Sequence, residues 1–361
     1  MSELTVSGFV SGSVLATEQR STDLELAIAA NPSAFRVLTG DRPTGPLHIG
    51  HYFGTLENRV RLQDAGVDLL VLVADYQVMT DRTVQAGLAD IVLGQIADYL
   101  AIGIDSGRAT IFAHSQVEAL NQLLLPFLSL VSVAEVGRNP TVKDETAALG
   151  SAGVSALMFS YPVHQAADIL FCHANVVPVG RDQLPHVELT RSIARRFNDR
   201  YSPGRPYFPE PQALLSDAPL LLGLDGRKMS KSLRNTVPLR ATADETAALV
   251  AGARTDSDRV ITYDPQRRPE VSNLLLIAAL CRGTEPEQLA AEIGAGGSAA
   301  LKALVTDAIN ERFASVRSRR QELTADPGYL RAVLAEGNER AAVIAASTMS
   351  SVRHLMHTSY Q

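Results

Sequence analysis

Short apolar runs alternate with segments of helix length from Phe35 to about residue 200, and this alternation constrains the fold more than any other feature. Runs with the length of buried strands lie at 35–40, 67–75, 109–115 and 175–180. Because strands joined by helix-length crossovers pair in parallel, the pattern predicts a parallel sheet covered by helices. Ligands bind such sheets at the carboxyl ends of the strands.

Helices are expected between these strands, at about 48–64, 83–103, 116–137, 154–172 and 182–200. The third segment carries Pro126, which predicts a kinked helix. The Pro-rich segment 201–227 is expected to form loops. Beyond about residue 240 strand signals vanish, and several of the remaining segments open on a capping residue or an early proline. We therefore expect an α/β domain followed by an all-helical C-terminal domain.

Composition excludes several classes of protein. The chain of 361 residues has a net charge of −6, which disfavours a non-specific nucleic-acid binder but allows local basic surfaces. No apolar run has the length of a membrane span, so we expect no membrane association. The first residues lack a basic stretch followed by an apolar one, which predicts a cytoplasmic protein without a signal peptide. Cys172 and Cys281 are expected to be free thiols.

Lysine is rare in this chain. Of 33 basic residues only four are lysines, at positions 143, 228, 231 and 302. A lysine retained against such a bias suits a site that needs a compact, mobile ammonium group instead of a planar guanidinium. Three of the four lie in the motifs described next.

The segment GDRPTGPLHIGHYFG, residues 40–54, follows the first strand and opens the first helix. His48 and His51 are three positions apart and share one helix face. A metal site is disfavoured, since the pair lacks the HExxH spacing and a nearby set of cysteine or carboxylate ligands. A Gly/Pro loop before a helix N-terminus suits an anion, and Gly50 allows close approach of a ligand to the backbone. Taken alone, the pair leaves phosphate binding and a structural role equally open.

The segment GRKMSKS, residues 226–232, is a second candidate for phosphate binding. Lys228 and Lys231 lie among glycine and serine in a cationic loop that contains half of all lysines. A solvated charged turn is the plain alternative. Neither GxxxxGK[ST] nor GxGxxG occurs, so the sequence predicts neither a P-loop nor a dinucleotide-binding turn.

Together, HIGH at 48–51 and KMSKS at 228–232 resemble the class I aminoacyl-tRNA synthetases. The intervening segments RNPTVKDE, SYPVHQAADIL and VPVGRDQLPHVELTR are similar to the tryptophanyl branch. The resemblance runs from about residue 36 to the C-terminus. It implies a Rossmann-like catalytic domain at 34–238, an anticodon-binding helical domain at 239–361 whose last helix can pack back on the catalytic domain, and an N-terminal extension at 1–33.

The resemblance implies tryptophan activation with ATP and Mg²⁺, release of pyrophosphate, and transfer to the 3′ end of tRNA(Trp), without a prosthetic group. The implied catalytic residues are His48, His51, Lys143, Lys228 and Lys231. The implied ATP-binding residues, besides His51 and the two KMSKS lysines, are Arg42, Pro43, Thr44, Gly50, Gly180, Arg181, Asp182, Met229, Ser230 and Ser232. In-line attack on the α-phosphate needs positioning and charge stabilisation more than acid–base chemistry.

For the amino acid, Asp168 matches the carboxylate that accepts the indole N–H in the family. A surface aspartate is the plain alternative, but the apolar residues around it favour a buried role. Tyr161 and Gln183 match positions near the substrate's ammonium and carboxylate groups. Gln77 and Gln165 stand near the pocket where many bacterial members have His and Met, which makes the pocket more polar.

The resemblance also implies partners. Family members are homodimers that bind tRNA across the two subunits, and Arg312, Arg317, Arg319 and Arg320 form a basic cluster suited to phosphate contacts. For any single one of these arginines, a solvated helix face is an equally good explanation. Three other hypotheses stay open: a tyrosyl-tRNA synthetase, a non-catalytic paralogue that binds tRNA or senses tryptophan, and a small-molecule adenylyltransferase.

Overall fold

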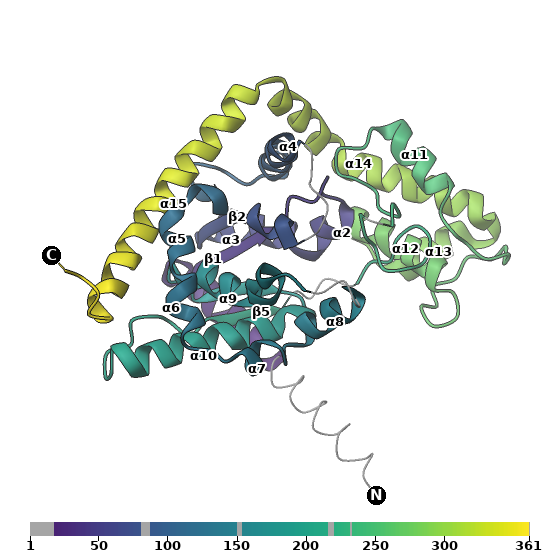
Figure 1. The fold of residues 1–361 in the computed structure, drawn as a ribbon. Helices are drawn as coiled ribbons and strands as arrows, with labels where there is room; N and C mark the ends of the chain where they lie inside the picture. Colours follow the sequence, from purple (N-terminus) through teal and green to yellow (C-terminus); the bar gives the residue numbers. More distant parts are fainter. Residues whose placement is uncertain (1–17, 81–86, 150–153, 216–219, 232, 361) are drawn as a thin grey trace, which may run out of the picture.

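Five parallel strands form the centre of the protein, which we describe from a computed structural model covering residues 18–80, 87–149, 154–215, 220–231 and 233–360 (Figure 1). The strands are β1 (Arg36–Asp41), β2 (Asp68–Val73), β3 (Ala109–Ala113), β4 (Val176–Val179) and β5 (Gln212–Leu215). Their order is β3-β2-β1-β4-β5, and every pair is parallel. The predicted α/β class and the first four strands are confirmed.

Alternation of side chains along the strands divides the core into two layers. Val37, Leu69 and Ile111 point to one face, and Leu38, Leu70 and Phe112 point to the other. Both faces are apolar because helices cover each of them, as expected for a parallel sheet.

Several of these helices lie within residues 49–201. The HIGH segment continues from α2 (Ile49–His51) through one π-helical turn, Tyr52–Leu56, into α3 (Glu57–Ala65). The expected helix at 83–103 is α4 (Leu88–Ala101), with the start of that segment outside the described residues. The expected helices at 154–172 and 182–200 are α9 (Ala156–Leu170) and α10 (Leu184–Tyr201), and a further helix, α8, spans Pro140–Leu149.

Two local predictions are wrong. The single kinked helix expected at 116–137 is three short helices, α5 (Glu118–Gln122), α6 (Leu124–Leu128) and α7 (Val133–Val136). Pro126 lacks the N–H for a continuous helix, and Ser132 in extended conformation starts a new one by accepting from Glu135 N–H. The segment 201–227 contains β5, which completes the sheet edge.

Residues 18–30 form a helix that packs on the α/β part of the molecule. Its buried face carries Ser21, Leu24 and Ile28, which recur at helical spacing. The Ser21 hydroxyl accepts a hydrogen bond from the Leu215 backbone N–H of β5, at 2.9 Å. The described part of the N-terminal extension is thus packed on the sheet.

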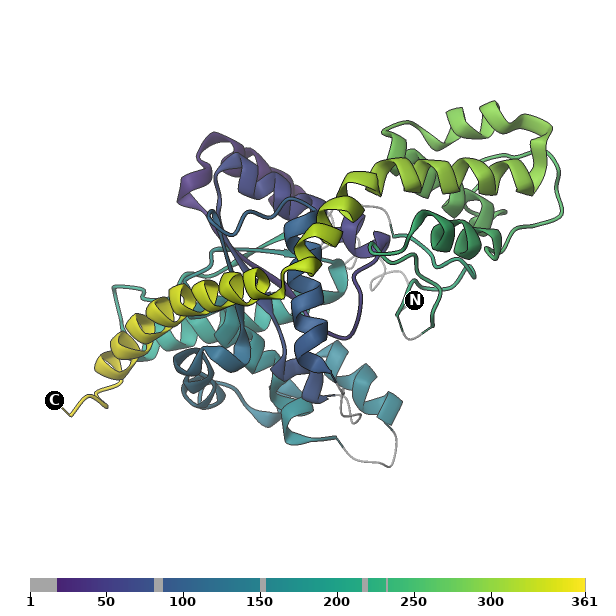
Figure 2. The same cartoon turned by 90° about the horizontal axis from the view of Figure 1, so that it is seen from above.

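Beyond residue 240 the described chain is helical, as predicted: α11 (Ala243–Ala251), α12 (Pro269–Arg282), α13 (Pro286–Ile293), α14 (Gly297–Ala325) and α15 (Pro327–Leu355). Figure 2 shows α11, α12 and α13 gathered beside one end of α14, away from the sheet. In contrast, α15 runs along the α/β part of the molecule (Figure 1).

Helix α15 lies directly on β3. A Cβ at Gly337 would overlap the backbone of Ile111, so glycine is required for this close approach. Asn338 Oδ1 accepts from Ala113 N–H at 2.9 Å, and Thr348 donates to the Phe171 carbonyl at 2.6 Å. In the part of the chain that the structure describes, no helix is both long and apolar enough to cross a bilayer.

Candidate active site

A cavity of about 310 Å³ opens where the sheet order reverses, between the carboxyl ends of β1 and β4. Crossovers leave β1 and β4 in opposite directions, so this crevice is the expected ligand site of such a sheet. Seven predicted site residues line it: Arg42, Gln77, Tyr161, Gln165, Asp168, Gly180 and Gln183.

Helix α9 supplies one wall of the cavity. Tyr161, Gln165 and Asp168 follow one another at spacings of four and three residues and therefore share a helix face. Asp168 is buried, with 1% of its surface exposed, and its Oδ1 accepts from Nε2 of His114 at 2.7 Å. The sequence placed Asp168 in the pocket, but it gave no sign of the buried His114 beside it.

The two HIGH histidines lie next to each other with ring centroids 3.7 Å apart. The His48 backbone N–H donates to Nδ1 of His51, at 3.2 Å. With Nδ1 used as an acceptor, neutral His51 carries its proton on Nε2 and can donate it to a ligand.

Both histidines are neutral at pH 7. Burial, together with the positive charge of Lys231 and the adjacent His51, lowers the pKa of His48 to about 3. Burial also lowers the pKa of His51 to about 4, although the Asp41 carboxylate opposes this shift. The pair therefore offers hydrogen bonds without carrying charge.

The KMSKS segment packs against the HIGH segment. Lys231 Nζ donates to the Gly45 carbonyl at 3.0 Å and lies 3.4 Å from Thr44 Oγ1. A Cβ on Gly50 would stand 2.6 Å from Met229 Sδ, so a larger residue at position 50 would displace the Met229 side chain. Burial lowers the pKa of Lys231, which Asp41 and Asp98 partly offset.

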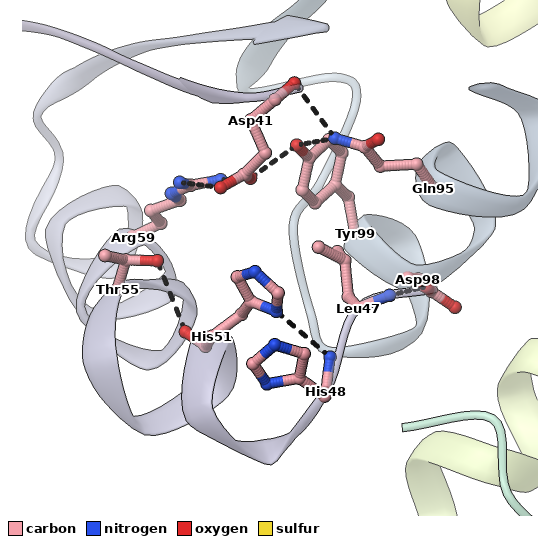
Figure 3. Close-up of polar contacts among 9 residues, drawn as sticks. All are labelled: Asp41, Leu47, His48, His51, Thr55, Arg59, Gln95, Asp98 and Tyr99. Carbon is pink, nitrogen blue, oxygen red and sulfur yellow. Dashed lines mark hydrogen bonds and ion pairs between the residues drawn. The ribbon is translucent and has the colours of Figure 1, made fainter. Parts of the chain in front are cut away.

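A network of charged and polar side chains lies beside the HIGH histidines (Figure 3). Arg59 pairs with both oxygens of Asp41, at 2.6 and 3.2 Å, and Tyr99 donates to the same carboxylate at 2.7 Å. Gln95 donates in turn to Tyr99, at 2.6 Å. The pKa of Asp41 lies below its usual value because Arg59 outweighs the effect of burial.

Three of the four clustered arginines form hydrogen bonds or ion pairs with other residues of the chain. Arg312 contacts Glu57 at 2.7 Å and the Tyr52 hydroxyl at 2.9 Å, Arg317 bonds Thr246 at 3.0 Å, and Arg320 pairs with the buried Asp98 at 2.5 Å. Asp98 also accepts from the backbone N–H of Leu47, at 3.4 Å (Figure 3). Of the four, Arg319 is the exposed one for which the described structure gives no ion pair. These contacts join α14 to the HIGH segment, to α4 and to α11, and the role of the cluster in phosphate contacts stays a prediction.

Some predicted residues lie outside the cavity lining. The adjoining HIGH segment contains five of them, Pro43, Thr44, His48, Gly50 and His51. The KMSKS segment contains Met229 and Ser230. The side chains of Lys228 and Lys143 are exposed, the latter on α8, while Ser232 falls outside the described residues. Arg181 forms an ion pair with Glu18, and Asp182 accepts from Gln183 at 3.0 Å.

The sequence predicted no metal site, and the described residues contain one set with suitable spacing. His114, His164 and Asp168 each offer a ligand atom, and these atoms lie within 4.8 Å of one another. Direct pairing of His114 with Asp168, and of His164 with Asn121 at 2.8 Å, already uses one ring nitrogen of each histidine.

Comparison with known proteins agrees with this geometry. The family model described as tRNA synthetases class I (W and Y) matches residues 31–314. The tryptophan–tRNA ligase of Streptococcus pyogenes serotype M1 is 38% identical, over 90% of this chain and 98% of its own length. That of Clostridium longisporum is 37% identical, over 90% and 97%. The structure of Campylobacter jejuni tryptophanyl-tRNA synthetase with ADP and tryptophan aligns with a TM-score of 0.77 and 31% identity, over 90% of this chain and 100% of that one.

A switch-point cavity flanked by HIGH and KMSKS, together with the family match over most of the chain, defines a class I aminoacyl-tRNA synthetase. The matches to the two curated relatives each cover 90% of this chain. The chain belongs to the tryptophan–tRNA ligase family.

Proposed function

We propose that the cavity and the two motifs beside it carry out both steps of tryptophan–tRNA ligation. In the first step a carboxylate oxygen of tryptophan attacks the α-phosphorus of ATP, and the bond to the leaving pyrophosphate breaks. In the second, the terminal ribose hydroxyl of tRNA(Trp) attacks the adenylate carbonyl, and AMP leaves. The observation that carries the proposal is the approach of Lys231 to the HIGH segment next to the Asp168 cavity.

The phosphate chain of ATP is assigned to the HIGH and KMSKS motifs. The Nε2–H of neutral His51 donates to a phosphate oxygen, and Lys231 and Lys228 supply positive charge to the leaving pyrophosphate. Lys143 of α8 is assigned to the same negative charge of the pyrophosphate because it matches a phosphate-contacting lysine of the family. Its side chain is exposed here, so this contact requires that the loops close. The nucleoside is assigned to the loop Gly180–Asp182, with Asp182 as acceptor for a ribose hydroxyl.

Tryptophan is assigned to the wall formed by α9. The indole N–H donates to Asp168, while Tyr161 and Gln183 hold the ammonium and carboxylate groups. Gln77 and Gln165 line the same cavity and add polar contacts around the ring. A buried carboxylate that must be paired rejects ligands without a donor.

Mg²⁺ is expected to enter with ATP. A hard cation prefers oxygen ligands and usually binds through substrate phosphates and water. The two imidazoles of the set around Asp168 do not suit it, so Mg²⁺ is assigned to the phosphate oxygens of the substrate.

The helical segment 239–361 is proposed to bind the anticodon of tRNA(Trp), with the extension 1–33 outside this function. A homodimer is proposed from the resemblance to the family, and Leu125 of α6 and Val133 of α7, which are 75% and 77% exposed, are candidates for its interface. A cytoplasmic location is proposed because the reaction that joins an amino acid to tRNA belongs to translation.

Amino-acid-dependent exchange between ATP and labelled pyrophosphate tests the first step. Tryptophan, tyrosine and phenylalanine are assayed in parallel on the wild type. Exchange with tryptophan alone is expected. Exchange with tyrosine would transfer the chain to the tyrosyl branch, and no exchange with any of them would favour a non-catalytic paralogue.

A further inference from the structure

A buried polar chain of four side chains ends on the carboxylate assigned to the indole. Asn121 of α5 anchors one end, because its amide nitrogen donates to the carbonyls of His114 and Val117, at 2.8 and 3.0 Å. Both amide hydrogens are thereby used, so Asn121 Oδ1 is the acceptor for His164 Nε2 at 2.8 Å. This fixes the proton of neutral His164 on Nε2.

His164 and Tyr76 hold the His114 ring in place. The ring centroid of His164 lies 4.7 Å from that of His114, and the ring of Tyr76 stacks at 6.4 Å. His114 itself has no exposed surface. Because its neighbours pack closely around it, the His114 ring cannot change its orientation unless they move.

The orientation of His114 decides which oxygen of Asp168 is available. His114 Nε2 is 2.7 Å from Oδ1, and this nitrogen must carry the proton, since a carboxylate only accepts. Among the described residues, Asp168 Oδ2 is buried and has no hydrogen-bond partner. Asp168 also lines the cavity, so one oxygen is occupied by the protein and the other is left for a ligand.

We propose that His114 is a positioning residue for amino-acid selection: it fixes Asp168 through Oδ1 so that Oδ2 is reserved for the N–H of the indole. The inference rests on the proposed assignment of Asp168 to tryptophan. A buried acceptor held without a partner penalises any ligand that cannot donate to it. Selection against such ligands therefore depends on His114, although His114 does not touch the substrate.

The test compares tryptophan with its benzothiophene analogue, in which sulfur replaces the indole N–H. Pyrophosphate exchange gives kcat/KM for both ligands in the wild type, His114→Leu and His114→Gln. For His114→Leu, the preference for tryptophan over the analogue is expected to fall about 10- to 100-fold, as for loss of a hydrogen bond to a charged group. His114→Gln retains an N–H donor and is expected to restore most of the preference.

The control is His173→Asn, which changes a histidine that packs on Tyr207 and Phe208 and lies outside the cavity lining. It is expected to leave the preference unchanged even if exchange becomes slower. An unchanged preference in His114→Leu, with slower exchange of both ligands, would reduce His114 to a packing residue and overturn the inference. Wild-type protein without tryptophan-dependent exchange would instead contradict the proposed function itself.

Discussion

Lys231 Nζ lies 3.0 Å from the carbonyl oxygen of Gly45, so the second signature motif reaches the first in the protein alone. Lys231 and Gly45 are 186 positions apart in the sequence, and Met229 on Gly50 adds an apolar contact between the two motifs. We expect the Lys231 ammonium to exchange this backbone carbonyl for a phosphate oxygen when ATP binds. The contact in the protein alone then keeps a positive charge beside the site.

Replacing Lys231 by Ala is expected to lower kcat for tryptophan-dependent pyrophosphate exchange by about 10²- to 10³-fold, the usual effect of losing one preorganised transition-state contact. KM for tryptophan is expected to change little, because Lys231 lies outside the cavity lining. Lys302→Ala is the matched control, since it removes a lysine of the helical segment whose ammonium donates to the Ala251 carbonyl. Equal rates in the two variants would argue against a role of KMSKS in catalysis.

The HIGH histidines make stability depend on pH. The pKa of His51 is about 4 when folded and about 6.5 when unfolded, so the unfolded chain binds more protons between these values. The free energy of unfolding is therefore expected to fall as pH falls through this range, by about 3 kcal/mol for His51.

Urea unfolding between pH 7 and pH 4 measures this loss. His51→Asn is expected to reduce the pH dependence by the share of His51 and to leave that of His48, whereas His357→Asn, at an exposed position, keeps the slope of the wild type. An unchanged slope in His51→Asn would mean that other groups cause the acid sensitivity.

Removing only one partner of the Asp41–Arg59 ion pair is expected to lower the free energy of unfolding strongly. Arg59→Met leaves the Asp41 carboxylate in the core with only Tyr99 as a side-chain partner, and a loss of about 3–5 kcal/mol is expected in chemical denaturation. Adding Asp41→Asn should recover part of the loss. Arg195→Met breaks an exposed pair with Glu210 and should have almost no effect on stability; a similar cost at both sites would mean that the network does not support the fold.

The N-terminal helix at 18–30 offers a test within one element. Ile28 is 1% exposed, and Ile28→Ala is expected to destabilise the protein by about 2–5 kcal/mol. Leu26, on the opposite face, is 68% exposed, and Leu26→Ala should have almost no effect. Thermal unfolding distinguishes the two variants, and equal midpoints would show that this helix does not dock in solution.

The sequence predicted the parts of this molecule that depend on local pattern. Continuous apolar runs identified β1 to β4. HIGH and KMSKS contact each other beside the cavity, and their contact with phosphate stays a prediction. β5 was missed because it has only four residues between proline-rich loops. The helix at 116–137 was overextended because its apolar spacing continues through three separate turns.

Contacts between distant residues could not be predicted in the same way. Asp41 and Arg59 are 18 residues apart, and His114 and Asp168 are 54 apart. Each is unremarkable in its own segment, and only the tertiary fold brings the end of β1 beside α3 and the residue after β3 beside α9. The carboxylate that ends β1, in GDRP, was the one available signal for the first pair. Similarly, the partners of the α14 arginines in α3, α4 and α11 could not be predicted, because they are distant in the sequence.

Charging of tRNA with labelled amino acid tests the central claim most directly, because it requires both chemical steps and the correct tRNA. The purified chain is incubated with ATP, Mg²⁺ and either tRNA(Trp) or tRNA(Tyr), each with its own amino acid. The account predicts acid-precipitable tryptophan on tRNA(Trp) and no tyrosine on tRNA(Tyr). Tyrosine charged to tRNA(Tyr), or no charging of either tRNA by folded protein, would contradict it.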